Sequence, residues 1–382
     1  MATFERFLEP PRLRTLDDDE PERRATWLEL FFDLVFVAAV AQLGQALAAD
    51  PSVRGIAEFA ALFVAVWWAW MGFTFYADRF DTDDLVYRAL TLAGMFAVAA
   101  VAVNVRHAFD DWTPFVVSYV LVRVVLLVLY VRARRHVAQA RRLTEIYLVL
   151  FSAGVALWLL TLALDPPMRY VVWGLALAIE VSAPTLGWRV VREAPVHRSH
   201  IPERFGLFAI IVLGEAVLAV VLGTSKTTWS VAPSAVAVAA FLTAAAIWWV
   251  HFDFGDSSVL GRGLGGLFYV YGHYPLVLGI AALGVGTKLA IVETPHGALH
   301  QATRWIYCGG VALALAAMGT VQLAGTRSLR DKDLWLRIGS AGAIAVVAAL
   351  IDAPVLLTWL VAAVLVGQVL LELVGHDRHH AM

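Results

Sequence analysis

The sequence predicts an all-α membrane protein, a polytopic bundle of about twelve transmembrane helices. Hydrophobic residues make up 60% of its 382 residues and charged residues 16%, whereas soluble domains have roughly 45–50% and about 25%. The hydrophobic residues gather in continuous runs of about 20, the length at which an α-helix crosses the hydrocarbon core of a bilayer. A soluble fold is therefore excluded, and the lipid bilayer is the first partner that the sequence predicts.

Twelve apolar runs follow one another along the chain. The clearest of them, such as Phe59–Ala77 and Thr227–Val250, contain no Asp, Glu, Lys or Arg. The eleventh is the weakest because Arg337 and Asp352 confine it to a short stretch, so eleven spans remain the alternative. The twelve predicted spans are Trp27–Leu47, Ile56–Ala77, Val86–Val105, Pro114–Val131, Leu143–Leu164, Tyr170–Trp188, Phe205–Leu222, Pro233–Val250, Leu267–Thr287, Trp305–Leu323, Leu334–Ile351 and Pro354–Val374.

The distribution of positive charge predicts the orientation of these spans. If successive loops alternate between the two sides, most of the 29 Lys and Arg residues fall on the side of the N-terminus. Lys and Arg accumulate in cytoplasmic loops, so we expect both termini in the cytoplasm. The net charge of −2 gives no indication of nucleic-acid binding.

The chain is expected to divide into an N-terminal cytoplasmic tail, 1–26, and two six-helix halves, 27–188 and 189–382, the second ending in a short cytoplasmic C-terminus. A weak repeat favours this division, because a Trp-Trp pair followed by acidic residues occurs at 67–68 and again at 248–249. Halves with an even number of spans would have the same orientation, as in parallel repeats. Alternatively, the Trp pairs simply mark the membrane interface.

Ionisable residues inside the predicted spans are the candidate functional residues, since a charge at the bilayer centre costs at least about 2.5–3.5 kcal/mol. Glu29 and Asp33 are four residues apart, which places both carboxylates on one face of the first helix. They are interpreted as part of a cation or proton path. The alternative is a structural pair bound to Arg88, Arg123 or a backbone donor.

Arg123 lies in the middle of the fourth span and needs a carboxylate partner at that depth. Glu180 in the sixth span, Glu215 in the seventh and Asp33 are the candidate partners. Such a pair is either a structural salt bridge or a charge that binds an anionic substrate or serves as the counter-charge of a titrating acid.

Glu215 is the best single candidate for a proton-titrating carboxyl, with Asp33 as the other. It follows Gly214 in an apolar helix, and the glycine would let another backbone approach. The alternative is a neutral carboxylic acid that is hydrogen-bonded across helices.

His273 is the remaining candidate for a binding or ion-path residue. It lies between Gly272 and Pro275, which suits either an interfacial anchor or a broken helix that lines a cavity. No repeated spacing of His and carboxylates predicts a metal site, and the single cysteine, Cys308, excludes a multi-thiolate zinc site. The other His and acidic residues considered near helix ends are His197, His200, His251, Asp253 and Asp256.

The segment 78–84 between the second and third spans holds four aspartates and one arginine. It is interpreted as a solvated turn in which Asp83 or Asp84 caps a helix, or as a cation-attracting mouth. Standard enzyme and cofactor signatures do not occur: there is no P-loop, no G-x-S-x-G, no H-E-x-x-H and no dinucleotide fingerprint. We therefore expect no cofactor and regard catalysis as the less favoured activity.

Residues 27–37, WLELFFDLVFV, resemble the first-helix motif of the bacterial low temperature requirement protein A family. Further matches are FDTDD at 80–84, ERFGLF at 203–208 followed by LGE at 213–215, and the Trp-Trp pair before Phe252 and Asp253. The resemblance implies a bacterial inner-membrane protein and no established substrate, cofactor or catalytic residue. Residues 31–36 are more weakly similar to the first-helix motif of a two-repeat, six-helix cation channel family, with Phe32 and Leu34 in place of its Ser and Gly.

These features favour secondary transport or channel-type permeation of a small solute or ion, with proton or cation coupling as an option. The first alternative is a membrane-embedded enzyme for a lipid or lipid-linked substrate, with His251, Asp253 or His273 at a lateral cavity. The second is a non-catalytic membrane sensor or scaffold in which every buried charge is paired. The substrate, the direction of movement and the oligomeric state stay open.

Overall fold

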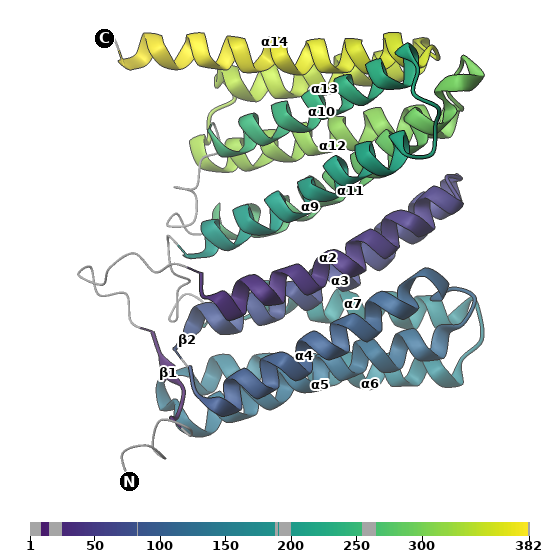
Figure 1. Ribbon diagram of the computed structural model, residues 1–382. Helices are drawn as coiled ribbons and strands as arrows, with labels where there is room; N and C mark the ends of the chain where they lie inside the picture. Colours follow the sequence, from purple (N-terminus) through teal and green to yellow (C-terminus); the bar gives the residue numbers. More distant parts are fainter. Residues whose placement is uncertain are drawn as a thin grey trace. The chain divides into compact units, whose positions relative to one another are not determined.

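The computed structural model describes residues 9–14, 25–81, 83–187, 190, 200–253 and 265–380. These residues form twelve long α-helices and one short antiparallel sheet, which confirms the all-α class (Figure 1). Each of the twelve predicted spans corresponds to one of these helices. The helices are α2 (Trp27–Ala49), α3 (Val53–Arg79), α4 (Leu85–Asn104), α5 (Trp112–His136), α6 (Arg141–Leu160), α7 (Met168–Leu186), α9 (His200–Thr224), α10 (Val231–Phe252), α11 (Gly265–Glu293), α12 (Gln301–Thr326), α13 (Lys332–Leu350) and α14 (Pro354–His380).

Eleven of these helices are long and apolar enough to cross a membrane, so the chain is a multi-pass membrane protein embedded in the lipid bilayer. The weak eleventh run of the sequence is α13, which is one of the eleven. The exception is α7, the sixth predicted span. This helix of 19 residues carries Arg169, Glu180 and an internal Pro184, and these residues lower its mean hydropathy.

The chain folds into two compact units. Unit 1 contains the residues up to Leu43 together with Ala61–Leu207, and unit 2 contains Gly44–Ala60 and the residues from Phe208 onward. Helices α2, α3 and α9 therefore contribute to both units. The predicted six-helix halves, and the repeat within them, stay predictions.

The two Trp pairs on which the predicted repeat depends have different surroundings. Trp67 and Trp68 are both buried, whereas Trp248 and Trp249 are both exposed. The first pair therefore belongs to the interior of unit 1 and does not mark a membrane interface there.

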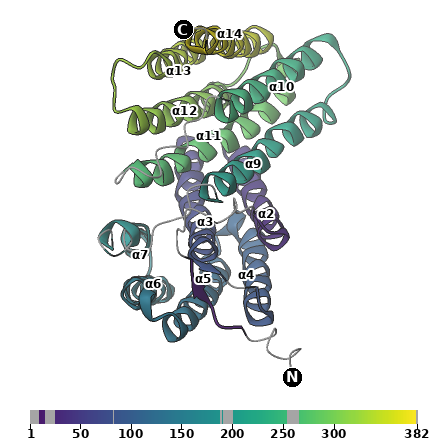
Figure 2. The same cartoon turned by 90° about the vertical axis from the view of Figure 1, so that its left-hand side faces the viewer.

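In unit 1, helices α4, α5, α6 and α7 pack in sequence order, each against the next (Figure 2). Strand β1 (Arg12–Leu13) pairs antiparallel with strand β2 (Phe80–Asp81), which follows α3 directly. The Arg14 amide also donates to the Arg79 carbonyl oxygen at 3.0 Å. Residues 9–14, which we expected in a tail, are thus attached to the end of α3; residues 15–24 lie outside the described residues.

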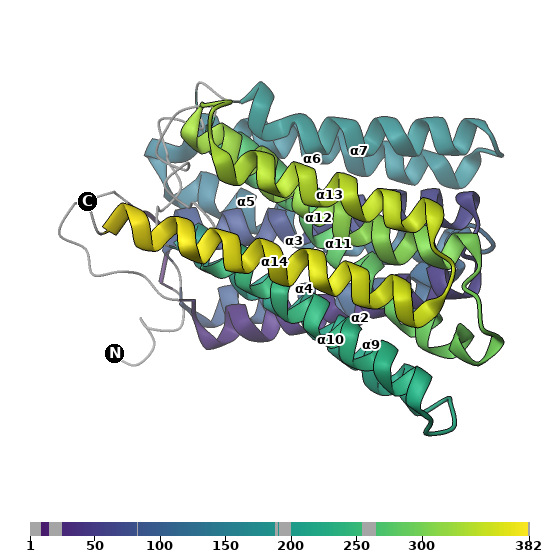
Figure 3. The same ribbon diagram turned by 90° about the horizontal axis from the view of Figure 1, so that it is seen from above.

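In unit 2, α12 packs on α11 and α13, and α14 packs on α10 and α13 (Figure 3). Glycines let the backbones of α11 and α12 approach closely, as small residues do at helix contacts in membranes. A Cβ atom on Gly310 would lie 2.7 Å from the Gly279 carbonyl oxygen, and a Cβ on Gly286 would lie 2.5 Å from the Tyr307 backbone. The contact therefore requires glycine at these positions.

We predict that Gly310→Ala destabilises the protein by about 1–3 kcal/mol, the usual cost of forcing extra volume into a packed contact. The added methyl group would meet the α11 backbone, which cannot rotate away as a side chain can. Gly309→Ala is the matched control, because a Cβ on Gly309 meets nothing within 4 Å. Unfolding in detergent measures both variants, and equal stability of the two would contradict the prediction.

Candidate functional site

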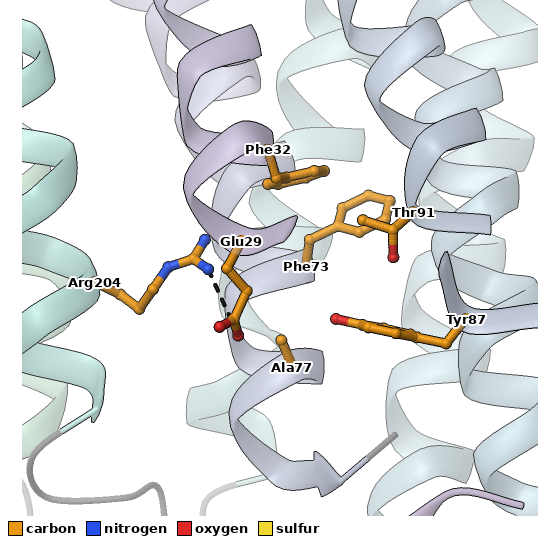
Figure 4. A pocket seen from close by; sticks show the side chains of 7 residues that line it. All are labelled: Glu29, Phe32, Phe73, Ala77, Tyr87, Thr91 and Arg204. Atoms are coloured by element: carbon orange, nitrogen blue, oxygen red, sulfur yellow. Dashed lines mark ion pairs between the residues drawn. The ribbon is translucent and has the colours of Figure 1, made fainter. Parts of the chain in front are cut away.

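Two carboxylates of α2 face a guanidinium of α9 inside unit 1. The Oδ1 atom of the fully buried Asp33 accepts hydrogen bonds from Trp70 Nε1 at 2.7 Å and from Arg204 Nη2 at 2.5 Å. Arg204 Nη1 lies 3.6 Å from Glu29 Oε1 (Figure 4). Glu29 and Asp33 therefore share one face of α2, as their spacing predicts.

A buried histidine joins the same group. His200 Nδ1 lies 2.8 Å from Asp78 Oδ1, and His200 Nε2 lies 3.3 Å from Glu29 Oε1. Asp78, which we placed in a solvated turn, is buried at the end of α3. We refer to Glu29, Asp33, Asp78, His200 and Arg204 as the charge cluster.

The local sequence holds Glu29 at the start of α2. The Thr26 amide donates to Glu29 Oε2 at 2.7 Å, and the Glu29 amide donates to Thr26 Oγ1 at 3.3 Å. This reciprocal pair is a capping box, which satisfies two backbone donors at a helix N-terminus. The carboxyl of Glu29 therefore has both a backbone contact and contacts with the charge cluster.

Aromatic rings pack the N-terminal part of α9 against α3. The Phe205 ring packs edge-on against the rings of Trp67 and Trp70, with centroid distances of 5.6 and 5.3 Å. The guanidinium of Arg204 lies 6.0 Å from the centre of the Trp70 ring. The buried rings of Trp67 and Trp70 thus position the guanidinium of Arg204 in the charge cluster.

His200 and Arg204 are functional candidates that the sequence analysis did not place there. We began the seventh span at Phe205, whereas α9 begins at His200. Their spacing of four residues puts both side chains on one helix face, as for Glu29 and Asp33. This spacing, which matches that of Glu29 and Asp33, was the sequence signal that could have identified His200 and Arg204 as candidates. Arg88, one of the alternative partners considered for Glu29 and Asp33, instead pairs with Asp83 at 2.7 Å near the surface.

Two aspartates of the segment 78–84 pair with arginines. Asp84 caps α4 by accepting from the Tyr87 amide at 3.0 Å, which confirms the predicted cap. It also accepts from Arg132 at 2.6 Å. Asp83 is bound to Arg88, so each of these two aspartates has an arginine partner, and the cation-attracting mouth stays a prediction.

A small pocket lies beside Glu29. Figure 4 shows Tyr87 and Thr91 of α4 on the side opposite to Glu29 and Arg204. The pocket has room for about one water-sized molecule. Thr91 is only 4% exposed, and its hydroxyl has no hydrogen-bond partner among the described residues. The other lining residues are Phe32, Phe73 and Ala77.

Arg123 forms a separate, fully buried ion pair in unit 1, and its partner is Glu180. Tyr119 lies between them: its hydroxyl donates to Glu180 Oε2 at 2.9 Å and accepts from Arg123 Nε at 3.0 Å. Gly154 makes room for this group, since a Cβ there would lie 2.6 Å from Glu180 Oε1. The structure thus selects Glu180 from the three partners that the sequence left open.

Glu215 lies in the unit 2 part of α9 and is half-buried. Its carboxyl has no ion pair or hydrogen bond within the described part of the chain. The expected backbone approach at Gly214 is wrong, because a Cβ there would meet nothing within 4 Å. The approach occurs instead at Ala216, whose Cα would lie 3.3 Å from a Cβ on Gly284.

His273 is buried in α11, and its Nδ1 lies 2.7 Å from the Tyr269 carbonyl oxygen. The helix continues through Gly272 and Pro275, so the broken-helix interpretation is wrong. The ring of His251 is 5.7 Å from that of His273. His197 and Asp256 lie outside the described residues, and the described residues contain no group of three metal-ligating side chains.

A third buried ion pair, in unit 2, was not expected from the sequence. Arg337 Nη2 lies 3.4 Å from Glu372 Oε2, and Gln368 Nε2 donates to Glu372 Oε1 at 2.9 Å. Arg337 lies near the start of the predicted eleventh span, Leu334–Ile351, and inside α13, which begins at Lys332.

Comparison with known proteins confirms the resemblance noted in the sequence. The family described as bacterial low temperature requirement A protein (LtrA) matches residues 24–369. The uncharacterized protein RA0937 of Rhizobium meliloti (strain 1021) is 31% identical over 301 residues, which is 72% of this chain and 72% of the relative. The family match extends through α10, α11, α12 and α13, where the sequence motifs are sparse.

We predict that Arg123→Leu destabilises the protein by about 3–5 kcal/mol, because it leaves the buried Glu180 without its cation. The double variant Arg123→Leu/Glu180→Leu is expected to regain most of this loss, since apolar side chains often replace a buried ion pair at little cost. Unfolding in detergent measures both variants. Arg134→Leu, which breaks an exposed pair with Glu145, is the control with a small effect. A double variant as unstable as the single one would contradict the prediction.

Proposed function

The chain belongs to the bacterial low temperature requirement A family of multi-pass membrane proteins, and we propose that it moves a small solute or ion across the bilayer with proton or cation coupling. The observation that carries this proposal is the buried charge cluster of unit 1. Ionisable residues inside membrane helices are costly, and they recur in proton relays and ion pathways.

The composition of the cluster supports coupling. Its three carboxyls, on Glu29, Asp33 and Asp78, face one guanidinium, Arg204, and one imidazole, His200. Carboxyls held this close together raise one another's pKa, which favours the binding of a proton or a monovalent cation among them.

Other buried charges support a different role. Arg123 and Glu180 compensate each other one to one, and we propose that this pair holds α5 and α7 together. Glu215 and His273 remain candidates for the pathway, Glu215 because its half-buried carboxyl has no described partner.

We further propose that the protein lies in the inner membrane with both termini in the cytoplasm. The excess of Lys and Arg on the side of the N-terminus supports this orientation. It requires an even number of spans, and therefore requires α7 to cross the membrane with its charges compensated.

In a Cys308→Ala background, we predict that Ser52→Cys and Ser225→Cys react with a membrane-impermeant maleimide from the same, outer side. Both positions are exposed, between α2 and α3 and between α9 and α10 respectively. If α7 does not cross, the two labels appear on opposite sides, which would refute the twelve-span arrangement. Gln139→Cys, between α5 and α6, is the control for the inner side, because it precedes α7 and is exposed.

We predict that Asp33→Asn and Arg204→Gln each lower ion flux in proteoliposomes by about tenfold or more. A factor of ten in rate corresponds to about 1.4 kcal/mol in activation free energy. This is less than the usual loss of stability when one partner of a buried charge pair is removed. Flux of H⁺, Na⁺ and K⁺ is measured separately under an imposed gradient.

Arg134→Gln, at the exposed pair with Glu145, is the control that retains flux. Glu215→Gln tests the second candidate carboxyl. Unchanged flux in both cluster variants would remove the cluster from the pathway. No flux of any of the three ions with the unaltered protein would refute ion-coupled permeation and favour the sensor or scaffold interpretation.

A further inference from the structure

The pocket beside Glu29 is lined by two residues with buried polar atoms that make no hydrogen bond to a described residue. These atoms are Thr91 Oγ1 on α4 and Arg204 Nη1 on α9. The two residues are only 4% and 1% exposed, so bulk solvent does not satisfy these atoms. Buried polar atoms in native proteins nearly always have a partner, which is either a protein group or an ordered water.

Thr91 differs in this respect from other buried threonines of the protein. Thr144, Thr243 and Thr358 each donate at 2.9 Å to the carbonyl oxygen four residues earlier in their own helix. That bond is a common one for a threonine hydroxyl inside a helix. Thr91 makes no such bond, and Figure 4 shows its hydroxyl directed toward Tyr87, another residue that lines the pocket. The hydroxyl can therefore bond to a ligand in the pocket.

The guanidinium of Arg204 bonds directly to one carboxylate of α2 and only approaches the other. Its Nη2 donates to Asp33 Oδ1 at 2.5 Å. Its Nη1 lies 3.6 Å from Glu29 Oε1, the ion pair drawn as a dashed line in Figure 4. This separation exceeds the length of an N–H···O hydrogen bond. Polar contacts longer than about 3.5 Å are often bridged by water.

The size and the chemistry of the pocket favour water over an ion. The pocket has room for about one water-sized molecule, whereas Mg²⁺ takes six ligands and Ca²⁺ six to eight. The guanidinium of Arg204 repels a metal cation, and the carboxylate of Glu29 repels an anion such as a halide. A water molecule is neutral, and it can accept from the first group and donate to the second.

We propose that this pocket binds one water molecule, which accepts a hydrogen bond from Arg204, donates one to Glu29 and forms a third with Thr91. Three hydrogen bonds are the usual number for a buried water. The water joins α4 to α2 and α9 inside unit 1. Such a water is expected whether or not the protein moves an ion, so this site goes beyond the proposed transport and does not rest on it.

A crystal structure of the full-length protein, at a resolution that shows ordered waters, tests the site. One peak is expected in the pocket, within hydrogen-bond distance of both Thr91 Oγ1 and Arg204 Nη1. An empty pocket in a map that shows other buried waters overturns the proposal. Crystals grown in rubidium bromide test for an ion, since an anomalous peak in the pocket would show that Rb⁺ or Br⁻ occupies it instead of water.

Two substitutions of Thr91 test its part in the site. Thr91→Ser keeps the hydroxyl and is expected to retain the water peak. Thr91→Val keeps the shape of the side chain and removes the hydroxyl, so the peak is expected to weaken or disappear. Thr144→Val is the matched control that retains the peak, because Thr144 is equally buried in α6 and bonds to backbone carbonyls. Equal peaks in the two Thr91 variants overturn the bond between Thr91 and the water.

Thermal unfolding in detergent tests the site without a map. With a bound water, Thr91→Val removes one of its three hydrogen bonds, and the midpoint of unfolding is expected to fall below that of the unaltered protein. In a dry pocket the hydroxyl is unsatisfied, and its replacement by a methyl group keeps or raises stability. A midpoint equal to or above that of the unaltered protein therefore overturns the proposal.

Discussion

A charge that leaves water for the interior of a helix bundle needs compensation within a few ångströms, and this requirement organises both units of the protein. Arg204 lies between Asp33 and Glu29, and Arg123 pairs with Glu180 in unit 1. In unit 2, Arg337 faces Glu372. In each pair the partners come from different helices, so charge compensation also specifies which helices pack together.

Small residues make these buried pairs possible. Gly154 of α6 leaves the space that the Glu180 carboxyl fills, and Gly72 of α3 lies beside Arg123, where a Cβ would be 3.3 Å from Nη1. Because α7 carries Glu180, it has too little hydropathy to count as a candidate span by composition alone. Its compensated charge explains how such a helix can lie in an apolar bundle.

The charge cluster differs from the other two buried ion pairs in composition and surroundings. Arg123 pairs with Glu180, and Arg337 faces Glu372. The cluster brings three carboxyls, a guanidinium and an imidazole together, and one of the carboxyls, Glu29, borders a pocket that has room for a water-sized molecule. We therefore propose a functional role for the cluster and structural support for the two pairs.

The sequence alone determined the membrane class, the twelve helices and the common face of Glu29 and Asp33, because hydropathy and helical periodicity are local properties. It did not determine which charges meet. Arg204 is 171 residues from Asp33 along the chain, and Glu180 is 57 from Arg123. Such contacts depend on which helices pack side by side and on where α9 begins, and helix spacing within one segment carries no information about either. Only the tertiary structure could therefore select Arg204 and His200 as the partners of the α2 carboxylates.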